Sequence, residues 1–483
     1  MTIDRRTLLK AAGAAAFLGA MPRGVWAAGQ AAAEKADYTL RIATGLVELA
    51  PEHIVSTTLY NGQFPGPLLR FKEGQRTVID IYNDTDTPEL LHPHGLIIPI
   101  DADGAAEEGS PYIPGHGMRR ISFVPQPSGL RFYHTHVVAG GDLNRGAYTG
   151  QAGPIYIEPK ANPGAYDREV FLVLKEFEPT FSQGGDMAMD VLAGEPLKGL
   201  QDIGKKKEEE FTGPKGYEVG YELFSINGKM LGHGEPIRVK QGERVLFHIV
   251  NASAGEIRSL ALPGHRFKIV ALDGNPVLTQ AEVPLLWLGT AERISALVEM
   301  NHPGVWVMGD LADDDRKRGM GIVVEYAGAT GEPQWVKPEP YLWDYTIFGK
   351  PGARPAEPDE TLDFLIVKEN GAIQGFNRWT LNGEAFSMEA MKPVYTVQKG
   401  RRYRLKFRNA SDDIHPLHLH RNTFELVRVH GKPTAGVLKD VVMVGGYQEV
   451  EFQFVAESPG LSLFHCHQQL HMDFGFMALF NCV

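Results

Sequence analysis

The chain has 483 residues, a hydrophobic content of 43% and a formal net charge of −11 at pH 7. That length is enough for about three domains, and the composition is ordinary for a globular protein. The acidic balance argues against nucleic acid or an anionic membrane surface as a partner.

The first 27 residues have the pattern of a targeting segment. Arg5 and Arg6 precede a short apolar run at residues 11–21, which is too short to span a membrane because a span needs about 20 residues. Paired arginines before such a run predict a twin-arginine signal peptide over 1–27, cut after Ala27; an ordinary Sec signal is the alternative. Twin-arginine machinery exports folded cargo, so we expect a bacterial periplasmic or secreted protein without stable membrane insertion.

Three internal repeats follow. Each begins with an apolar run that ends in an Asn-Gly pair, at Asn61-Gly62, Asn227-Gly228 and Asn382-Gly383. Each continues with a glycine that opens a strand-like stretch, and nine residues later comes an asparagine: Asn83, Asn251 and Asn409. Apolar and polar residues alternate in these stretches, as in half-buried strands. A period of this kind indicates one fold repeated three times.

Short strands with regular turn signals predict an all-β chain of three β-sandwich domains. We place the domains at 36–160, 166–330 and 361–483, with Pro- and Gly-rich linkers at 159–164 and 331–360. The charged run at 205–210 is interpreted as a solvated loop.

Histidines gather in four groups that hold ten of the seventeen in the chain. The groups are His92 and His94; His134 and His136; His415, His418 and His420; and His465, His467 and His471. An i, i+2 pair on a strand lies on one face, so two imidazoles can reach one metal ion or two neighbouring ions. One thiolate among imidazoles favours copper.

Cys466 lies between His465 and His467. If this run is extended, the cysteine faces one side and both histidines face the other. Two metal centres would then be joined through one peptide segment, which suits electron transfer. The chance clustering of these residues in a buried strand is the alternative.

The repeats carry their histidines unequally. His134 follows Gly129 by five residues and His465 follows Gly460 by five, whereas the matched place in the middle repeat is Gly309. We therefore expect a metal cluster shared by the first and third domains, with the second domain as a spacer and a wall of the substrate site.

On these motifs the chain resembles a three-domain multicopper oxidase of the bacterial laccase type over its whole mature length. The resemblance implies three cupredoxin-like Greek-key β-sandwich domains and four copper ions. It implies a type 1 copper bound by Cys466, His415 and His471. It also implies a trinuclear cluster, with type 2 copper on His92 and His418, one type 3 ion on His94, His134 and His467, and the other on His136, His420 and His465.

The chain departs from the family pattern at two places. The axial position of the type 1 copper holds Phe476, which cannot ligate copper, and a local bulge that lets the next residue, Met477, coordinate is the alternative. The carboxylate that many relatives carry after the last histidine is replaced by Met472, with Asp473 adjacent. Asp103 matches the family's other acid, so Asp103 is the expected catalytic proton relay; a turn aspartate before Gly104 is the alternative.

Three functions are compatible with the resemblance. The first is a laccase that couples one-electron oxidation of phenols or aromatic amines to reduction of dioxygen to water. The second is a metallo-oxidase for Cu(I) or Fe(II) in metal tolerance, which the lack of a methionine-rich lid disfavours. The third, a scaffold without copper, disagrees with the filled ligand positions. Asp412 and Asp413 precede His415 and are expected either to accept a donor's proton or to be loop acids.

Overall fold

The computed structural model describes residues 34–160, 165–182, 191–211 and 214–483. The predicted signal peptide over 1–27 lies outside this range, as does most of the predicted linker at 159–164. Strands make up 49% of the chain and helices 8%, which confirms the all-β prediction. Among the described residues, no helix has the length and apolar character needed to cross a membrane.

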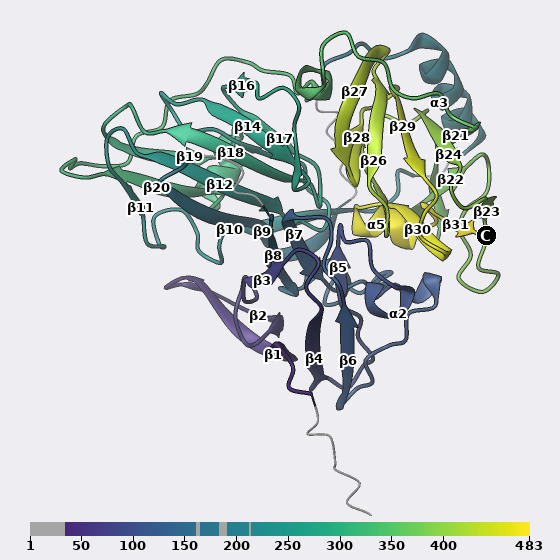
Figure 1. Ribbon diagram of the computed structural model, residues 1–483, viewed down its shortest axis with the longest axis horizontal. Coiled ribbons are helices and arrows are strands. Elements are labelled where there is room, and N and C mark those ends of the chain that lie inside the picture. The colour runs from purple at the N-terminus through teal and green to yellow at the C-terminus, as the bar shows by residue number, and fades with distance from the viewer. Residues whose placement is uncertain (1–33, 161–164, 183–190, 212–213) are drawn as a thin grey trace, which may run out of the picture. The chain divides into compact units, whose positions relative to one another are not determined.

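The first repeat forms two four-stranded sheets (Figure 1). One sheet has the order β2 (His53–Tyr60), β1 (Tyr38–Ala50), β4 (Thr77–Asn83) and β6 (Gly117–Phe123). The other has the order β3 (Leu69–Lys72), β8 (Ala152–Glu158), β7 (Gly129–His134) and β5 (His92–His94). Short helices α2 (Ile100–Asp103), η2 (Ala106–Glu108) and η3 (Gly146–Tyr148) lie in its loops.

The second repeat has the larger sheet β10 (Glu218–Ile226), β9 (Arg168–Ser182), β12 (Arg244–Asn251), β18 (Arg293–Glu299), β14 (Phe267–Leu272) and β15 (Asn275–Pro276), with β16 (Glu282–Val283) paired to β14. Its smaller sheets are β11 (Ile237–Val239), β20 (Gly321–Tyr326) and β19 (Val305–Gly309), and β13 (Arg258–Leu260) with β17 (Leu286–Leu288). Helices α3 (Lys198–Glu210) and α4 (Asp313–Lys317) belong to its loops.

The third repeat has one sheet of β22 (Phe376–Leu381), β21 (Glu360–Ile373), β24 (Arg402–Asn409), β29 (Glu449–Val455), β26 (Phe424–Val429) and β27 (Lys432–Lys439). The facing sheet is β23 (Val394–Val397), β31 (Met477–Cys482), β30 (Gly460–Cys466), β25 (His415–Leu419) and β28 (Val441–Val444). Helix α5 (Gln469–Asp473) follows β30, and η4 (Tyr345–Phe348) precedes the repeat.

The Asn-Gly pairs explain why the three repeats fold alike. Both residues of each pair have positive φ, for example 53° at Asn61 and 68° at Gly62, as the tight turn of a β-hairpin requires. The Asn61 side chain also accepts from Arg41 N and donates to Thr39 O, and Asn227 and Asn382 make the same two bonds in their repeats. The pairing of β1 with β4, β9 with β12 and β21 with β24 is parallel in each case. The predicted threefold repeat is therefore confirmed, whereas the exact domain limits stay predictions.

One segment differs from what the sequence predicts, and one predicted linker contributes to the core. The charged run at 205–210 is the end of helix α3, not a loop, because Lys and Glu are good helix formers and Leu200 buries one side of the helix. The linker at 331–360 is packed: Trp343, Tyr345 and Phe348 are buried in the core.

Candidate copper centres

Four strands bring the histidine groups together. His92 on β5 lies opposite His134 on β7 in the first repeat, and His418 on β25 lies opposite His465 on β30 in the third. Strand pairing thus places side chains that are far apart in sequence on two facing sheet ends. The eight histidines gathered here are all buried: His92, His94, His134, His136, His418, His420, His465 and His467.

The eight rings form one cluster, in which the family resemblance implies two ligand groups of three and one pair. In the first group, the His94, His134 and His467 centroids lie 5.0 to 5.6 Å apart. In the second, the centroids of His136, His420 and His465 lie 4.8 to 5.2 Å apart. The pair, with centroids 5.9 Å apart, consists of His92 and His418. Rings of different sets lie closer still, with centroids 4.1 Å apart for His92 and His420 and 3.9 Å apart for His94 and His418, so the division into sets stays a prediction.

Hydrogen bonds from the ring nitrogens that face away from the cluster fix which nitrogen of each ring points inward. Nδ1 donates to a backbone carbonyl in His92, His134, His418 and His465, at 2.6 to 2.8 Å. Nδ1 of His420 donates to the carboxylate of Asp103 at 2.8 Å. A backbone carbonyl only accepts, so four of these rings hold their proton on Nδ1, and the contact with Asp103 selects the same tautomer in His420. Each Nε2 then presents a lone pair to the interior.

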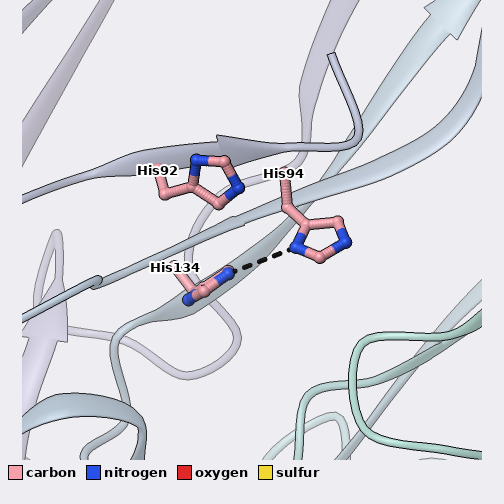
Figure 2. A group of neighbouring side chains, drawn as sticks. All are labelled: His92, His94 and His134. Carbon is pink, nitrogen blue, oxygen red and sulfur yellow. Dashed lines mark hydrogen bonds between the residues drawn. The ribbon is translucent and has the colours of Figure 1, made fainter. Parts of the chain in front are cut away.

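Facing lone pairs imply a cation between them. The Nε2 atoms of His420 and His465 lie 3.1 Å apart, and neither has a proton to share. Figure 2 shows the equivalent contact in the first repeat, where Nε2 of His134 lies 3.4 Å from Nδ1 of His94. Within the described chain, Nε2 of His92 and of His418 are buried and have no hydrogen-bond partner.

Burial also keeps the rings neutral. It lowers the pKa of seven of the eight histidines well below their usual range, because a charged ring would lose its hydration and repel its neighbours. Neutral, converging imidazoles are the ligands that copper prefers. The residues present therefore fit a multinuclear copper cluster.

A second group lies on the other face of β30. Sγ of Cys466 is 3.7 Å from Nδ1 of His415 and 3.7 Å from Nδ1 of His471, and all three residues are buried. Burial raises the pKa of the Cys466 thiol, so a bound soft cation is needed to hold it as thiolate. One thiolate with two imidazoles is the ligand set of a blue-copper site.

The two groups are joined through one strand, as the sequence predicts. Nε2 of His465 lies 3.4 Å from Nε2 of His136 in the cluster, while the next side chain, Cys466, points to His415 and His471. The alternation of faces along β30 causes this division.

Phe476 lies beside the cysteine site. It is fully buried, its ring centroid is 5.0 Å from that of His415, and its carbonyl accepts from Cys466 N. Met477 pairs with His465 in the register of β30 and β31, so its side chain lies on the face opposite Cys466. Met477 packs there against Leu463 and Leu479. Phe476 therefore lies beside the Cys466 group, and Met477 lies on the other face of the sheet.

Asp103 lies at the cluster. It is fully buried at the end of α2; its carbonyl accepts from His92 and its carboxylate from His420, while Oδ1 has no hydrogen-bond partner among the described residues. Asp473 does not point the same way: its carboxylate accepts from Ala139 N, Gly140 N and Gln469 Nε2, and burial raises its pKa to about 7.

Asp412 and Asp413 are ion-paired. Their carboxylates lie 2.9 and 2.8 Å from Nζ of Lys368, and Asp413 is buried. The same lysine lies over the ring of Trp379, which packs against both His415 and His471.

Sequence reasoning missed several supporting residues. Glu108 lies 3.6 Å from His420 Nδ1, Ser411 Oγ lies 3.1 Å from His415 Nε2, and Asp440 lies 3.1 Å from His94 Nε2. Glu108 and Asp440 are acidic residues in ordinary loop or strand contexts, so no local motif marks them. Ser411 lies four residues before His415, and this short spacing was a signal that it contacts the histidine.

Comparison with known proteins agrees with this geometry. Three multicopper oxidase family models match residues 42–162, 201–325 and 357–482. The chain is 29% identical to multicopper oxidase MmcO of Mycobacterium tuberculosis, over 87% of this chain and 82% of that protein. It is 23% identical to laccase-3 of Thanatephorus cucumeris, over 93% and 91%.

Among solved structures, Fet3p, a multicopper oxidase that functions in iron import, superposes with a TM-score of 0.74. The match covers 92% of this chain and 90% of Fet3p at 17% identity, and it confirms the three-domain cupredoxin-like fold. The chain therefore belongs to the multicopper oxidase family, whose members are copper oxidoreductases that use oxygen and hold four copper ions.

Proposed function

We propose that this protein is a laccase-like oxidase, which couples one-electron oxidation of phenols or aromatic amines to four-electron reduction of dioxygen to water. One observation supports the coupling of the two half-reactions. The run His465–His467 places a thiol in one metal-binding group and its neighbouring imidazoles in another, so a single strand connects the two.

We propose the copper ligands that the family resemblance implies, and the clustering of these side chains supports them. Type 1 copper would be held by Cys466, His415 and His471, with Phe476 as a non-coordinating axial neighbour. Type 2 copper would be held by His92 and His418. The type 3 ions would be held by His94, His134 and His467, and by His136, His420 and His465.

Copper supplies reversible one-electron chemistry at these sites. The chain supplies the rest: Cys466 and its peptide links to His465 and His467 form the covalent path between the centres. Trp379 and Phe476 exclude water from the cysteine group, since both rings are buried against His415. Asp103 holds His420 in one tautomer and is the proposed source of protons for oxygen reduction.

An aromatic cluster near α5 supports an aromatic donor. The ring of Phe376 stacks on Phe474, three residues after His471, with centroids 4.3 Å apart and planes 16° apart. The ring centroids of Tyr217 and Phe181 each lie 5.3 Å from that of Phe376. Phe181 is exposed, so the cluster reaches the surface and offers faces on which an aromatic substrate can stack.

A metallo-oxidase is the second candidate function. Two observations favour it. Fet3p, which shares this fold, functions in iron import. The carboxylate of Asp412 binds Lys368, which lies over Trp379 beside His415. A cation donor would be attracted by carboxylates, but Lys368 already neutralises part of this charge.

Turnover of a phenol, Cu(I) and Fe(II) by the copper-loaded protein, with oxygen uptake recorded, tests the proposal. A laccase oxidises the phenol with the highest kcat/KM and consumes one oxygen molecule per four electrons. The same assay on Cys466→Ser gives the rate of oxidation by loosely bound copper, which is then subtracted from the wild-type rate. A kcat/KM for Cu(I) or Fe(II) far above that for the phenol would favour the metallo-oxidase instead.

We also propose that twin-arginine machinery exports the folded protein to the periplasm or the medium, with cleavage after Ala27. The motif at Arg5 and Arg6 supports this route. Replacing both arginines with lysine should retain the precursor in the cytoplasm, and N-terminal sequencing of the exported wild type should begin at Ala28. Unchanged export of the double variant would point to the Sec route.

A further inference from the structure

His94 is oriented differently from the histidines around it. Five neighbouring rings turn Nδ1 outward, whereas His94 turns Nε2 outward, 3.1 Å from Oδ1 of Asp440. Its Nδ1 then faces Nε2 of His134 (Figure 2). A carboxylate acceptor selects the tautomer with the proton on Nε2 and leaves the Nδ1 lone pair for the cluster.

Asp440 is itself held by two buried guanidinium groups. Nη1 and Nη2 of Arg293 donate to its two oxygens at 2.7 and 2.5 Å, and Nη1 of Arg131 donates to Oδ2 at 3.3 Å. All three side chains are fully buried. A bidentate guanidinium fixes both the position and the plane of a carboxylate. The plane of Asp440, and hence the direction in which it accepts from His94, is set by Arg293.

Arg293 comes from the repeat that contributes no candidate ligand. It begins β18 of the second repeat, Arg131 lies on β7 of the first, and Asp440 lies between β27 and β28 of the third. The backbone leaves room for this contact only because the residue after His94 is a glycine. A Cβ at Gly95 would lie 2.6 Å from Arg293 Nη2 and 2.7 Å from Asp440 Oδ2.

The surrounding charges are balanced. Lys439 bridges two further buried carboxylates, Asp273 at 2.9 Å and Glu292 at 3.0 Å. Three cations therefore meet three carboxylates in the part of this network that the structure describes, and the burial of charge is compensated. Within it, Asp440 is the carboxylate that contacts a candidate copper ligand, whereas Glu292 contacts Lys439 and Tyr345.

We propose that Asp440 is a positioning residue that holds His94 with Nδ1 toward the trinuclear cluster. Arg293, from the second domain, fixes the position of Asp440 and so takes part in orienting His94. The inference rests on the proposed ligand set. Through the contact between Arg293 and Asp440, the second domain, which holds no candidate ligand, influences copper binding in addition to its role as a spacer. The backbone carbonyl of Asp440, which accepts from His418, is unaffected by a change of its side chain.

The test compares Asp440→Asn with Glu292→Gln after copper reconstitution. Both variants remove one buried negative charge from the same network, and both are expected to lower stability. Only Asp440→Asn should weaken binding of a cluster copper, by about 10–100-fold, as is usual for loss of a partner to a ligating histidine. The readouts are copper content per chain during titration with a chelator, and the EPR spectrum, in which an incompletely filled copper pair becomes visible.

The blue band serves as an internal standard, since Cys466 lies on the other face of β30. An Asp440→Asn protein that keeps the blue band but loses a cluster copper supports the proposal. Wild-type copper affinity in Asp440→Asn, or an equal loss in Glu292→Gln, would overturn it. A wild-type protein that binds no cluster copper would refute the proposed ligand set instead, which separates the two failures.

Arg293→Lys provides a second variant if Asp440→Asn does not fold. Lysine keeps the charge but cannot make the bidentate contact. A weaker cluster copper with an unchanged blue band is expected, and Arg293→Lys with wild-type affinity would contradict the role of Arg293.

Discussion

Nδ1 of His420 donates to Oδ2 of Asp103 over 2.8 Å, across 317 residues of sequence. The contact joins the third repeat to the first, directly at the histidine cluster. Asp103→Asn keeps the shape of the side chain and removes its dissociable proton. We expect reoxidation by oxygen to slow by about 10²-fold or more, the usual contribution of a general acid, while reduction by substrate stays fast.

Stopped-flow measurement separates these two steps, because reduction of the blue site and its reoxidation are observed in turn. Glu108→Gln, which alters a neighbouring buried carboxyl group near the same histidine, is the matched control. Unimpaired reoxidation of Asp103→Asn would assign proton delivery to another group.

Cys466→Ser tests the cysteine site. A hydroxyl is a harder and far less acidic ligand than a thiol, so the variant should lack the blue absorption band. The cluster histidines lie on the other face of β30, so their coppers should remain partly bound. Copper analysis and the visible spectrum check both expectations, and a blue Cys466→Ser protein would refute the assignment.

Phe476→Met tests the axial position. Phenylalanine gives no donor atom to the metal, which disfavours Cu(II) relative to Cu(I) and raises the potential. Methionine has a similar volume and adds a thioether, so the potential should fall. A fall of about 60 mV would correspond to about 1.4 kcal/mol in this one-electron couple. Redox titration of both proteins gives the answer; an unchanged or higher potential would mean that position 476 does not approach the metal.

The ion pairs of Lys368 bear on the donor site. Because its ammonium group already holds Asp412 and Asp413, we expect these carboxylates to act as fixed charges and not as proton acceptors. Asp412→Asn should then change kcat/KM by the same small factor for a phenol and for a donor that has no proton to lose. The comparison across pH checks this, and a loss confined to phenols would show that Asp412 accepts the proton.

His430 provides a test of stability that is independent of copper. Burial lowers its pKa from 6.5 to about 4, and neither ring nitrogen has a hydrogen-bond partner in the described structure. Nearby, Asp344 opposes this shift and Lys432 adds to it. The unfolded chain takes up a proton below pH 6.5 and the folded chain does not, so stability is lost as pH falls from 6.5 toward 4.

The loss at pH 5 should reach about 2 kcal/mol, from 1.36 kcal/mol per pKa unit. His430→Asn suits the positive φ of 49° at this turn and should remove the part of the pH dependence that this ring contributes. Urea unfolding of both proteins at pH 7 and pH 5, in the same copper-loaded state, measures the difference. Equal pH dependence in the two proteins would contradict the prediction.

The sequence by itself determined the repeats, the class of fold and the candidate copper-binding groups. These features are local: Asn61-Gly62 dictates a hairpin turn, and alternation along His465–His467 dictates two faces, whatever the rest of the chain does. The run at 205–210 was predicted wrongly because its helix depends on a face that packs at Leu200, outside the charged stretch itself.

Only the tertiary structure decided which groups support the ligands. Asp440 reaches His94 across 346 residues, and Arg293 reaches Asp440 across 147. No spacing or periodicity marks such partners, because their contact depends on how the three sandwiches pack together. The same holds for Met477, whose face follows from the register of β30 with β31. Ligands can be recognised from local chemistry, whereas the groups that orient them are set by long-range packing.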